Sequence, residues 1–333
     1  MRRLVVAAIF VSLAAAPAAQ SQGPATAKLT YRLNLVGHTA TPVVFTGSTF
    51  RVRGNLIPYV AGQKVRVRFF RKGKAIGTKV VHVLAPSTGT AGKFVVNFHT
   101  RYPGRITAGI THEATGKQAY AHATTPAINV IGHTATIGQH TSTVKVMQRL
   151  LKADGYVPSL SGTYDQRTGF AVLAFRKMSG LGRVTTVASH TMLRRLINGG
   201  GQFEVLFPHQ GRHAEGDLGH QVLALIDGSK VERLYPISSG KPSTPTVLGT
   251  FRVYSRVPGY LPDGMYYSSF FTGGYAIHGY DPSPIYPASH GCLRTQIAQA
   301  IEIYDWLAMG DYVDTYYRTG HHRHPKPSPN AGP

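Results

Sequence analysis

The hydrophobic period changes twice along the chain, and this change constrains the fold more than any other feature of the sequence. Over residues 27–131, short runs alternate apolar with polar residues, and in one of them Val65, Val67 and Phe69 alternate with basic residues. A period of two indicates strands with one buried face, so these three side chains are expected to face inward. Turn signals such as 71–74 separate the runs. The sequence therefore predicts a small β-sandwich.

The period lengthens to that of a helix in the next segment. Apolar residues recur at helical spacing from Val144 to Leu151, and again after Asp165 and after Ser189. Asp and Ser are favoured at the position that caps the start of a helix. We therefore expect three short helices within residues 138–198.

Strands return after the glycine-rich run at 198–201, which predicts a flexible joint. Residues 221–237 alternate around an Asp227-Gly228 turn, as is typical of a β-hairpin. Further strands are expected at 249–255 and 274–278, and a helix at about 296–309. Its buried face is expected to carry Ile297, Ala300, Ile301, Tyr304 and Leu307. The sequence thus predicts a β-rich domain over residues 202–318.

The N-terminus has the pattern of a secretory signal peptide, expected over residues 1–22. Arg2 and Arg3 precede an apolar run from Leu4 to Ala16, and small residues follow. The run is shorter than the roughly 20 residues of a membrane-spanning helix, although an uncleaved anchor is an alternative. The protein is expected to be exported.

The chain is strongly basic. Its 36 Lys and Arg against 14 Asp and Glu give a formal net charge of +22. Such a charge attracts polyanions. Export argues against nucleic acid and favours an anionic cell-wall or membrane surface, while a basic surface that only maintains solubility is the alternative.

The chain contains one cysteine, Cys292. An exported chain with a single cysteine has no internal disulfide, so the thiol forms an intermolecular cross-link or is reactive. A reactive thiol needs a base, and His290 and His278 are both candidates. Gly291 leaves room for backbone N–H groups to converge on an oxyanion, and Arg294 adds a fixed positive charge. A buried, inert cysteine is the alternative for Cys292 taken alone.

These residues carry a resemblance. His278-Gly279 followed by Ser289-His290-Gly291-Cys292-Leu293-Arg294 resembles the signature of the L,D-transpeptidase (YkuD) family, as does the strand-turn-strand pattern of residues 235–251. The resemblance covers about residues 202–317. It implies an acyltransferase that cross-links peptidoglycan stem peptides without a metal or organic cofactor.

The resemblance also implies roles for the individual residues. Cys292 would attack the carbonyl before the terminal D-alanine of a tetrapeptide stem, with His278 as the base and later the acid. The Gly279 carbonyl would orient His278. His290 and Gly291 would shape the oxyanion pocket, supported by Ser289 and Arg294. A lid over the donor site, with its Gly and Pro hinges, would include Tyr260, Met265, Tyr266 and Tyr267.

The helical segment resembles the peptidoglycan-binding domain 1 family. The matching residues are Val144, Gln148, Leu151, Gly155, Tyr156, Gly162, Tyr164, Asp165, Thr168, Ala171, Val172 and Phe175. The Asp-Gly pair that is common in a later loop of that family is missing from residues 184–187. The resemblance implies binding to peptidoglycan, and a three-helix spacer without a ligand is the alternative.

The resulting hypothesis is a mainly β, multidomain protein. It comprises an N-terminal immunoglobulin-like β-sandwich, a small three-helix peptidoglycan-binding module, a C-terminal YkuD-type catalytic domain and a disordered tail at 319–333. We expect a monomer that is secreted, associates with the cell wall and acts in peptidoglycan biosynthesis and cell shape. The rival hypotheses are an L,D-carboxypeptidase of the same fold, a catalytically inactive wall-binding protein and a nucleic-acid binder.

Overall fold

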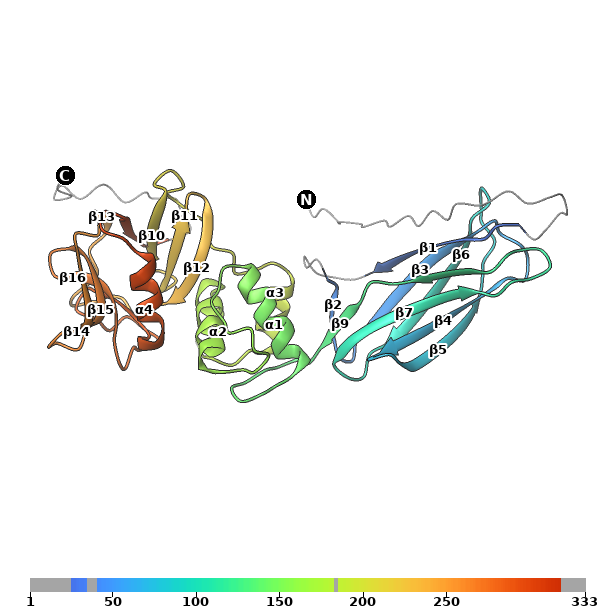
Figure 1. Cartoon of the computed structure of the whole chain (residues 1–333), viewed down its shortest axis with the longest axis horizontal. Coiled ribbons are helices and arrows are strands. Elements are labelled where there is room, and N and C mark those ends of the chain that lie inside the picture. Colours follow the sequence, from blue (N-terminus) through green and yellow to red (C-terminus); the bar gives the residue numbers. More distant parts are fainter. Residues whose placement is uncertain (1–24, 35–40, 183–184, 319–333) are drawn as a thin grey trace. The chain divides into compact units, whose positions relative to one another are not determined.

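The computed structural model describes residues 25–34, 41–182 and 185–318. The expected signal peptide and C-terminal tail lie outside this range. The chain divides into two compact units, residues 1–133 and 134–333 (Figure 1). Across the described residues the fold is mainly β with four helices, as the sequence predicts. None of the helices described is long and apolar enough to cross a membrane.

The first unit consists of two β-sheets. One has the strand order β1-β3-β6, formed by β1 (Lys28–Asn34), β3 (Thr49–Ile57) and β6 (Gly92–His99). The other has the order β2-β9-β7-β4-β5, and β8 pairs with β7 beside this path. Its strands are β2 (Val43–Phe45), β4 (Lys64–Arg71), β5 (Lys74–His82), β7 (Gly104–His112), β8 (Ala121–Thr124) and β9 (Ile128–Ile131).

Alternating side chains of both sheets enclose a single hydrophobic core. In β4, Val65, Val67 and Phe69 are buried in this core, whereas the basic residues between them are exposed. The core also contains Val52 of β3 and Val96 of β6. The predicted inward face of β4 is therefore confirmed, while the immunoglobulin class of the unit stays a prediction.

The second unit begins with three helices, each capped by a side chain. They are α1 (Ser142–Ala153), α2 (Gln166–Met178) and α3 (His190–Ile197). Thr141, Asp165 and Ser189 accept hydrogen bonds from backbone N–H groups in the first turns. Such caps satisfy donors that have no partner within the helix. Asp165 and Ser189 are the residues at which the sequence predicts that the second and third helices start.

The remainder of the second unit contains two sheets. A five-stranded sheet has the order β12-β11-β10-β18-β13, and a four-stranded sheet has the order β14-β15-β16-β17. The strands are β10 (Arg212–Asp217), β11 (Val222–Asp227), β12 (Lys230–Pro236), β13 (Gly249–Arg252), β14 (Ser255–Tyr260), β15 (Tyr266–Thr272), β16 (Tyr275–Gly279), β17 (Leu293–Thr295) and β18 (Tyr312–Tyr316). The predicted hairpin is formed by β11 and β12.

Helix α4 (Ile297–Trp306) packs against β15 and β16. Its buried face carries Ala300 and Ile303, with Leu307 buried just beyond the helix, whereas Ile301 is 43% exposed. The prediction for Ile301 is therefore wrong. Ile301 and Ile303 both lie at helical spacing from other apolar residues of α4. Ile303 is the buried one because it reaches the core that the two sheets share.

Helix α2 and the turn after α1 pack on the five-stranded sheet. The backbone N–H of Leu234 in β12 donates to the Gly155 carbonyl at 2.9 Å. From α2, the Lys177 ammonium donates to the Ile237 carbonyl at 2.7 Å, and Arg167 pairs with Glu302 of α4 at 2.5 Å. Burial lowers the pKa of Lys177 to about 7. The helical segment thus contacts the chain directly beyond β12, which leads into the site described below.

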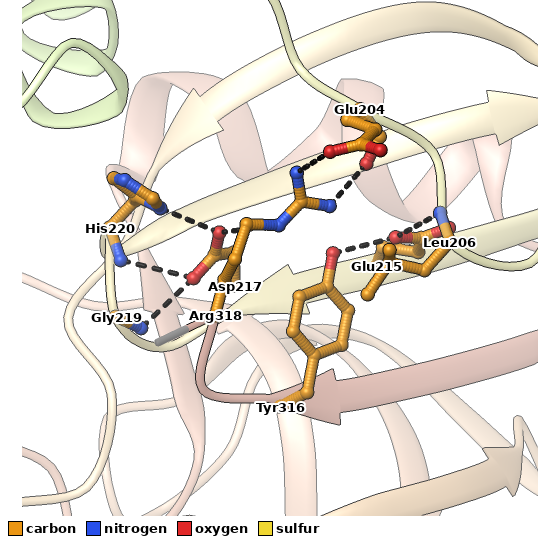
Figure 2. A network of polar contacts seen from close by, with 8 residues as sticks. All are labelled: Glu204, Leu206, Glu215, Asp217, Gly219, His220, Tyr316 and Arg318. Atoms are coloured by element: carbon orange, nitrogen blue, oxygen red, sulfur yellow. Dashed lines mark hydrogen bonds and ion pairs between the residues drawn. The ribbon is translucent and has the colours of Figure 1, made fainter. Parts of the chain in front are cut away.

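A buried polar network ties the two ends of this β-rich part together (Figure 2). Glu215 of β10 accepts hydrogen bonds from the Leu206 N–H and, at 2.6 Å, from the Tyr316 hydroxyl. Asp217 accepts from the N–H groups of Gly219 and His220 and pairs with the His220 ring at 2.7 Å. Arg318 pairs with Glu204 at 2.9 Å. Because buried carboxylates are costly unless hydrogen-bonded, this network favours one arrangement of strands β10 and β18.

Candidate active site

His278 is the penultimate residue of β16, and the next residue, Gly279, sets the orientation of its ring. The side chain is buried, and Nδ1 lies 2.9 Å from the Gly279 carbonyl oxygen. A carbonyl oxygen only accepts hydrogen bonds, so Nδ1 carries the proton when the ring is neutral. Nε2 is then left as the basic nitrogen.

Cys292 directly precedes β17, which pairs with β16 in parallel so that His278 lies opposite Arg294. The Cys292 thiol is partly exposed, and its Sγ lies 3.7 Å from the Gly274 carbonyl oxygen. His278 and Cys292 both line a cavity of about 590 Å³. The other lining residues are Asp263, Met265, Gly274, Tyr275, Tyr280, His290 and Arg294.

Burial keeps both reacting groups neutral. Burial, together with the nearby Arg294 charge, lowers the pKa of His278 to about 4, against the opposing effect of the hydrogen bond to Gly279. Burial also raises the pKa of the Cys292 thiol. A hydrogen bond with the Ala276 backbone and the positive charge of Arg294 partly oppose this increase. At neutral pH the site therefore holds a thiol beside a neutral imidazole, which suits proton transfer during attack more than a preformed ion pair.

Ser289 closes the loop of residues 289–292, which carries the expected nucleophile Cys292 and which we call the nucleophile loop. Its hydroxyl donates to the Cys292 carbonyl at 2.6 Å and accepts the Gly291 N–H at 3.0 Å, and the residue is fully buried. The Gly291 N–H is thus already engaged within the turn. Ser289 consequently holds the loop that carries Cys292.

Gly291 is required by close approach of an aromatic ring. Its φ is +122°, a conformation that favours glycine, and a Cβ at this position would lie 1.8 Å from Cε1 of Tyr275. Any side chain at Gly291 would collide with the Tyr275 wall of the cavity. The main contribution of Gly291 is therefore space and backbone conformation.

The segment 238–246, which follows β12, holds this loop in place through hydrogen bonds. Ser238 exchanges backbone hydrogen bonds with Arg294, and the Ser289 N–H donates to Ser239. Thr246 Oγ1 donates to the Gly291 carbonyl at 2.7 Å and accepts the Gly240 N–H at 2.9 Å. The two sequence segments that carry the family resemblance therefore meet at the nucleophile.

One cation, Arg294, lines the cavity, and a second, Lys241, contacts the lining residue His290. The Arg294 guanidinium stacks on the Tyr280 ring, 3.8 Å from its centroid. Nε2 of His290 lies 3.3 Å from the Lys241 ammonium. Since an ammonium group only donates, His290 is the acceptor in this pair. These cations suit a substrate that carries carboxylates.

The residues expected to form a lid lie at the tip of the β14–β15 hairpin. Met265 lines the cavity, and its carbonyl accepts the Leu261 N–H at 2.8 Å. Tyr260, Tyr266 and Tyr267 instead pack against one another. The ring centroids of Tyr260 and Tyr266 lie 4.3 Å apart, and those of Tyr266 and Tyr267 lie 4.7 Å apart in an edge-on arrangement. These three tyrosines are not among the residues that line the cavity.

Several residues at the cavity had no individual role predicted from the sequence. Asp263, Tyr275 and Tyr280 line the cavity, and Thr246 and Lys241 contact its loop. Lys241 and Thr246 lie within the motif segment 235–251 and Asp263 lies between the expected lid residues, whereas Tyr275 and Tyr280 only flank the His278 motif. Contact across the β15–β16 hairpin and the 238–246 segment brings them to the site, and neither contact follows from residue spacing.

A family model of the L,D-transpeptidase catalytic domain, YkuD, matches residues 211–315. Among solved structures, the chain is similar to the L,D-transpeptidase of Xylanimonas cellulosilytica, with 30% identity and a TM-score of 0.50 over 55% of this chain and 97% of that one. It is also similar to the catalytic domain of the Enterococcus faecium L,D-transpeptidase, with 27% identity and a TM-score of 0.29 over 32% of this chain and 98% of that one. No curated protein matches the chain.

The catalytic-domain match covers the sheets and the loops that bring His278 and Cys292 to one cavity. The chain also covers 97% of the solved Xylanimonas structure, which comprises residues 123–326 of that enzyme, at 30% identity. It therefore belongs to the L,D-transpeptidase family, with a YkuD catalytic domain in its C-terminal part.

Proposed function

We propose that this protein is an exported L,D-transpeptidase that cross-links peptidoglycan stem peptides through a thioester on Cys292. The observation that carries the proposal is the shared cavity of Cys292 and His278 within the YkuD domain. The Gly279 carbonyl fixes Nδ1 of His278 as the protonated nitrogen, so Nε2 is the group that takes the thiol proton.

The first half-reaction forms the thioester. Sγ of Cys292 attacks the carbonyl carbon that precedes the terminal D-alanine of the donor stem, and the thiol proton passes to His278 Nε2. The oxyanion draws on donors around the nucleophile, such as the Cys292 N–H and His290, because the Gly291 N–H is engaged with Ser289. The carbon–nitrogen bond then breaks, and His278 returns the proton to the amine of the departing D-alanine.

The second half-reaction transfers the acyl group. An amine of an acceptor stem attacks the thioester carbon and gives its proton to His278. The carbon–sulfur bond breaks, the sulfur is reprotonated, and an amide cross-link is released. Water as the attacking group would give an L,D-carboxypeptidase, so exclusion of water from the cavity decides between the two outcomes. No step requires a metal or an organic cofactor.

Charge favours the orientation of the donor. The donor stem ends in carboxylates, and Arg294 beside Tyr280 and Lys241 beside His290 provide positive charge near Cys292. Met265 and Asp263 at the hairpin tip close another side of the cavity. We therefore assign Arg294 and Lys241 to carboxylate binding and the hairpin tip to the lid.

Residues 138–198 are proposed to bind peptidoglycan and to hold the catalytic part near its substrate. The supporting observation is that helix α2 of this segment contacts the catalytic part, through Lys177 at the Ile237 carbonyl and through Arg167 at Glu302 of α4. Together with the signal-peptide pattern at 1–22, this contact supports the proposal of a secreted monomer that associates with the cell wall.

The proposal is tested by incubating the protein with a disaccharide tetrapeptide and identifying the products by mass spectrometry. Cross-linked dimer is expected from the parent and is expected to be lost in Cys292→Ala and His278→Ala. His209→Ala is the matched control, because this histidine lies in the same domain and does not line the cavity. Tripeptide without dimer would indicate the hydrolase. Binding to peptidoglycan without any turnover would indicate an inactive wall-binding protein.

A further inference from the structure

The acidic residues are distributed unevenly between the two units. Glu113 is the one Asp or Glu among residues 1–133, so the other 13 of the 14 lie in the second unit. Glu113 is paired with Arg66 at 2.7 Å. The first unit therefore has no other carboxylate side chain to offset its remaining lysines and arginines.

A groove in the first unit collects part of this excess charge. A cavity of about 780 Å³ lies where the edge strands β5 and β6 of the two sheets approach each other. Its lining residues are Thr49, Arg71, Ile76, Lys79, Asn97, Phe98, His99, Arg101, Tyr102 and Ile106. We call this cavity the basic groove.

The cations of the basic groove come from separate elements. Arg71 ends β4, Lys79 lies within β5, and Arg101 follows β6. Lys79 pairs with Val67 across the strands, so its side chain starts on the inner face of the sheet, beside the core. Three like charges around one cavity repel one another, and an anionic occupant would relieve that repulsion.

The groove also offers apolar and aromatic surface. Phe98 is partly buried and Ile106 is buried, while Tyr102 is 63% exposed. The Arg71 guanidinium lies 5.4 Å from the centroid of the Tyr102 ring. A flat ring beside cations suits a chain that alternates CH-rich polyol or sugar units with negative charges.

We propose that the basic groove binds a linear anionic polymer of the cell envelope, whose repeating units carry phosphodiester or carboxylate groups. Single contacts between exposed charges are weak, so useful affinity requires a ligand that presents several charges at once. The class of ligand rests on the proposed function, because export to the cell wall makes such polymers the available polyanions. The groove would hold the enzyme on the wall independently of its catalytic cavity.

The test measures binding of the full-length protein to three probes by calorimetry at low and at physiological ionic strength. The probes are poly(glycerol phosphate), polygalacturonate and a single-stranded oligonucleotide of matched charge. In the double variant Lys79→Ala/Arg101→Ala, affinity for the preferred wall polymer is expected to fall by about tenfold or more. Tyr102→Ala is expected to weaken the same binding.

The matched control is Lys64→Ala/Arg68→Ala, which removes the same charge from the exposed outer face of β4. This control is expected to bind within about twofold of the parent. Preference for poly(glycerol phosphate) or for polygalacturonate identifies the anionic group. Equal losses in both double variants, tighter binding to the oligonucleotide, or no binding of the parent to either wall polymer would overturn the proposal. Cys292→Ala is expected to bind normally, which separates this result from failure of the proposed reaction.

Discussion

Two segments of the second unit carry family motifs, but the structure uses their residues in different ways. In the helical segment, the matching side chains Gln148, Tyr164 and Phe175 are fully buried. Gln148 donates to the Thr163 carbonyl and accepts the Gly162 N–H, so it joins a loop to α1. In the catalytic segment, the matching residues line an open cavity or hold its loop.

This difference separates folding from chemistry. A match between buried residues indicates how a segment folds, because core positions are constrained by packing. A match between residues that line a cavity indicates what a segment does, because their side chains are free to meet a ligand. Substitutions in the helical motif should therefore change stability, and those in the catalytic motif should change rate.

The largest effect is expected for His278→Gln. Loss of the general base should slow acylation of Cys292 by a carbapenem about 10²- to 10⁴-fold, because proton transfer typically contributes that much. The rate is measured by intact-protein mass spectrometry. His209→Gln serves as the control, and a loss smaller than about tenfold would show that His278 is not the base.

The next effect tests the helical motif. Phe175→Ala removes a buried ring that packs edge-on against Tyr156, and we expect a loss of about 3–5 kcal/mol in the free energy of unfolding. Denaturant unfolding measures this loss, and Leu160→Ala, at an exposed position, is the control. Below the unfolding transition, Cys292 should still be acylated at the parent rate. A selective loss of acylation in the folded variant would break the comparison.

A smaller effect is expected where folding and chemistry meet. Thr246→Val removes the hydroxyl between the Gly291 carbonyl and the Gly240 N–H, leaving two buried groups without this partner. We expect a destabilisation of about 1–3 kcal/mol together with slower acylation. Thr246→Ser keeps the hydroxyl and should restore both properties. Normal acylation in the valine variant would show that the hydrogen bonds of Thr246 do not position Cys292.

The smallest effect at neutral pH concerns titration of His278. Burial lowers its pKa to about 4 in the folded state, below the value of about 6.5 for an unperturbed histidine. Between these values the unfolded chain binds more protons, so stability should fall as the pH drops from about 6.5 to about 4. Acylation should decline as the pH falls through about 4. Comparing the pH profiles of the parent and His278→Gln measures both changes, and identical stability profiles would contradict the assigned pKa.

The sequence predicted elements whose signal is local. The caps at Asp165 and Ser189, the hairpin of β11 and β12 and the inward face of β4 follow from spacing and residue type. The motif also placed Cys292 and His278 in one site, although His278 lies in β16 and Cys292 lies in the loop before β17.

Other features depended on contacts between distant segments. Tyr275 enters the cavity because β15 and β16 form a hairpin beside the nucleophile loop, and the clash at Gly291 is visible only then. Ile301 was assigned to the wrong face because its helix offers two apolar faces and the sheets select one. Lys177 was not singled out from the sequence, and only the packing of α2 shows that it is buried against the Ile237 carbonyl. These contacts reflect tertiary packing, which residue spacing does not specify.

The account is tested most directly by trapping the acyl-enzyme. The protein is mixed with a tetrapeptide donor without acceptor, quenched in acid, digested and mapped by mass spectrometry. A tripeptide acyl group on the peptide that contains Cys292, with release of one D-alanine per adduct and no adduct in Cys292→Ala, is the predicted result. Continued D-alanine release by Cys292→Ala, or an adduct on another residue, would contradict the central claim.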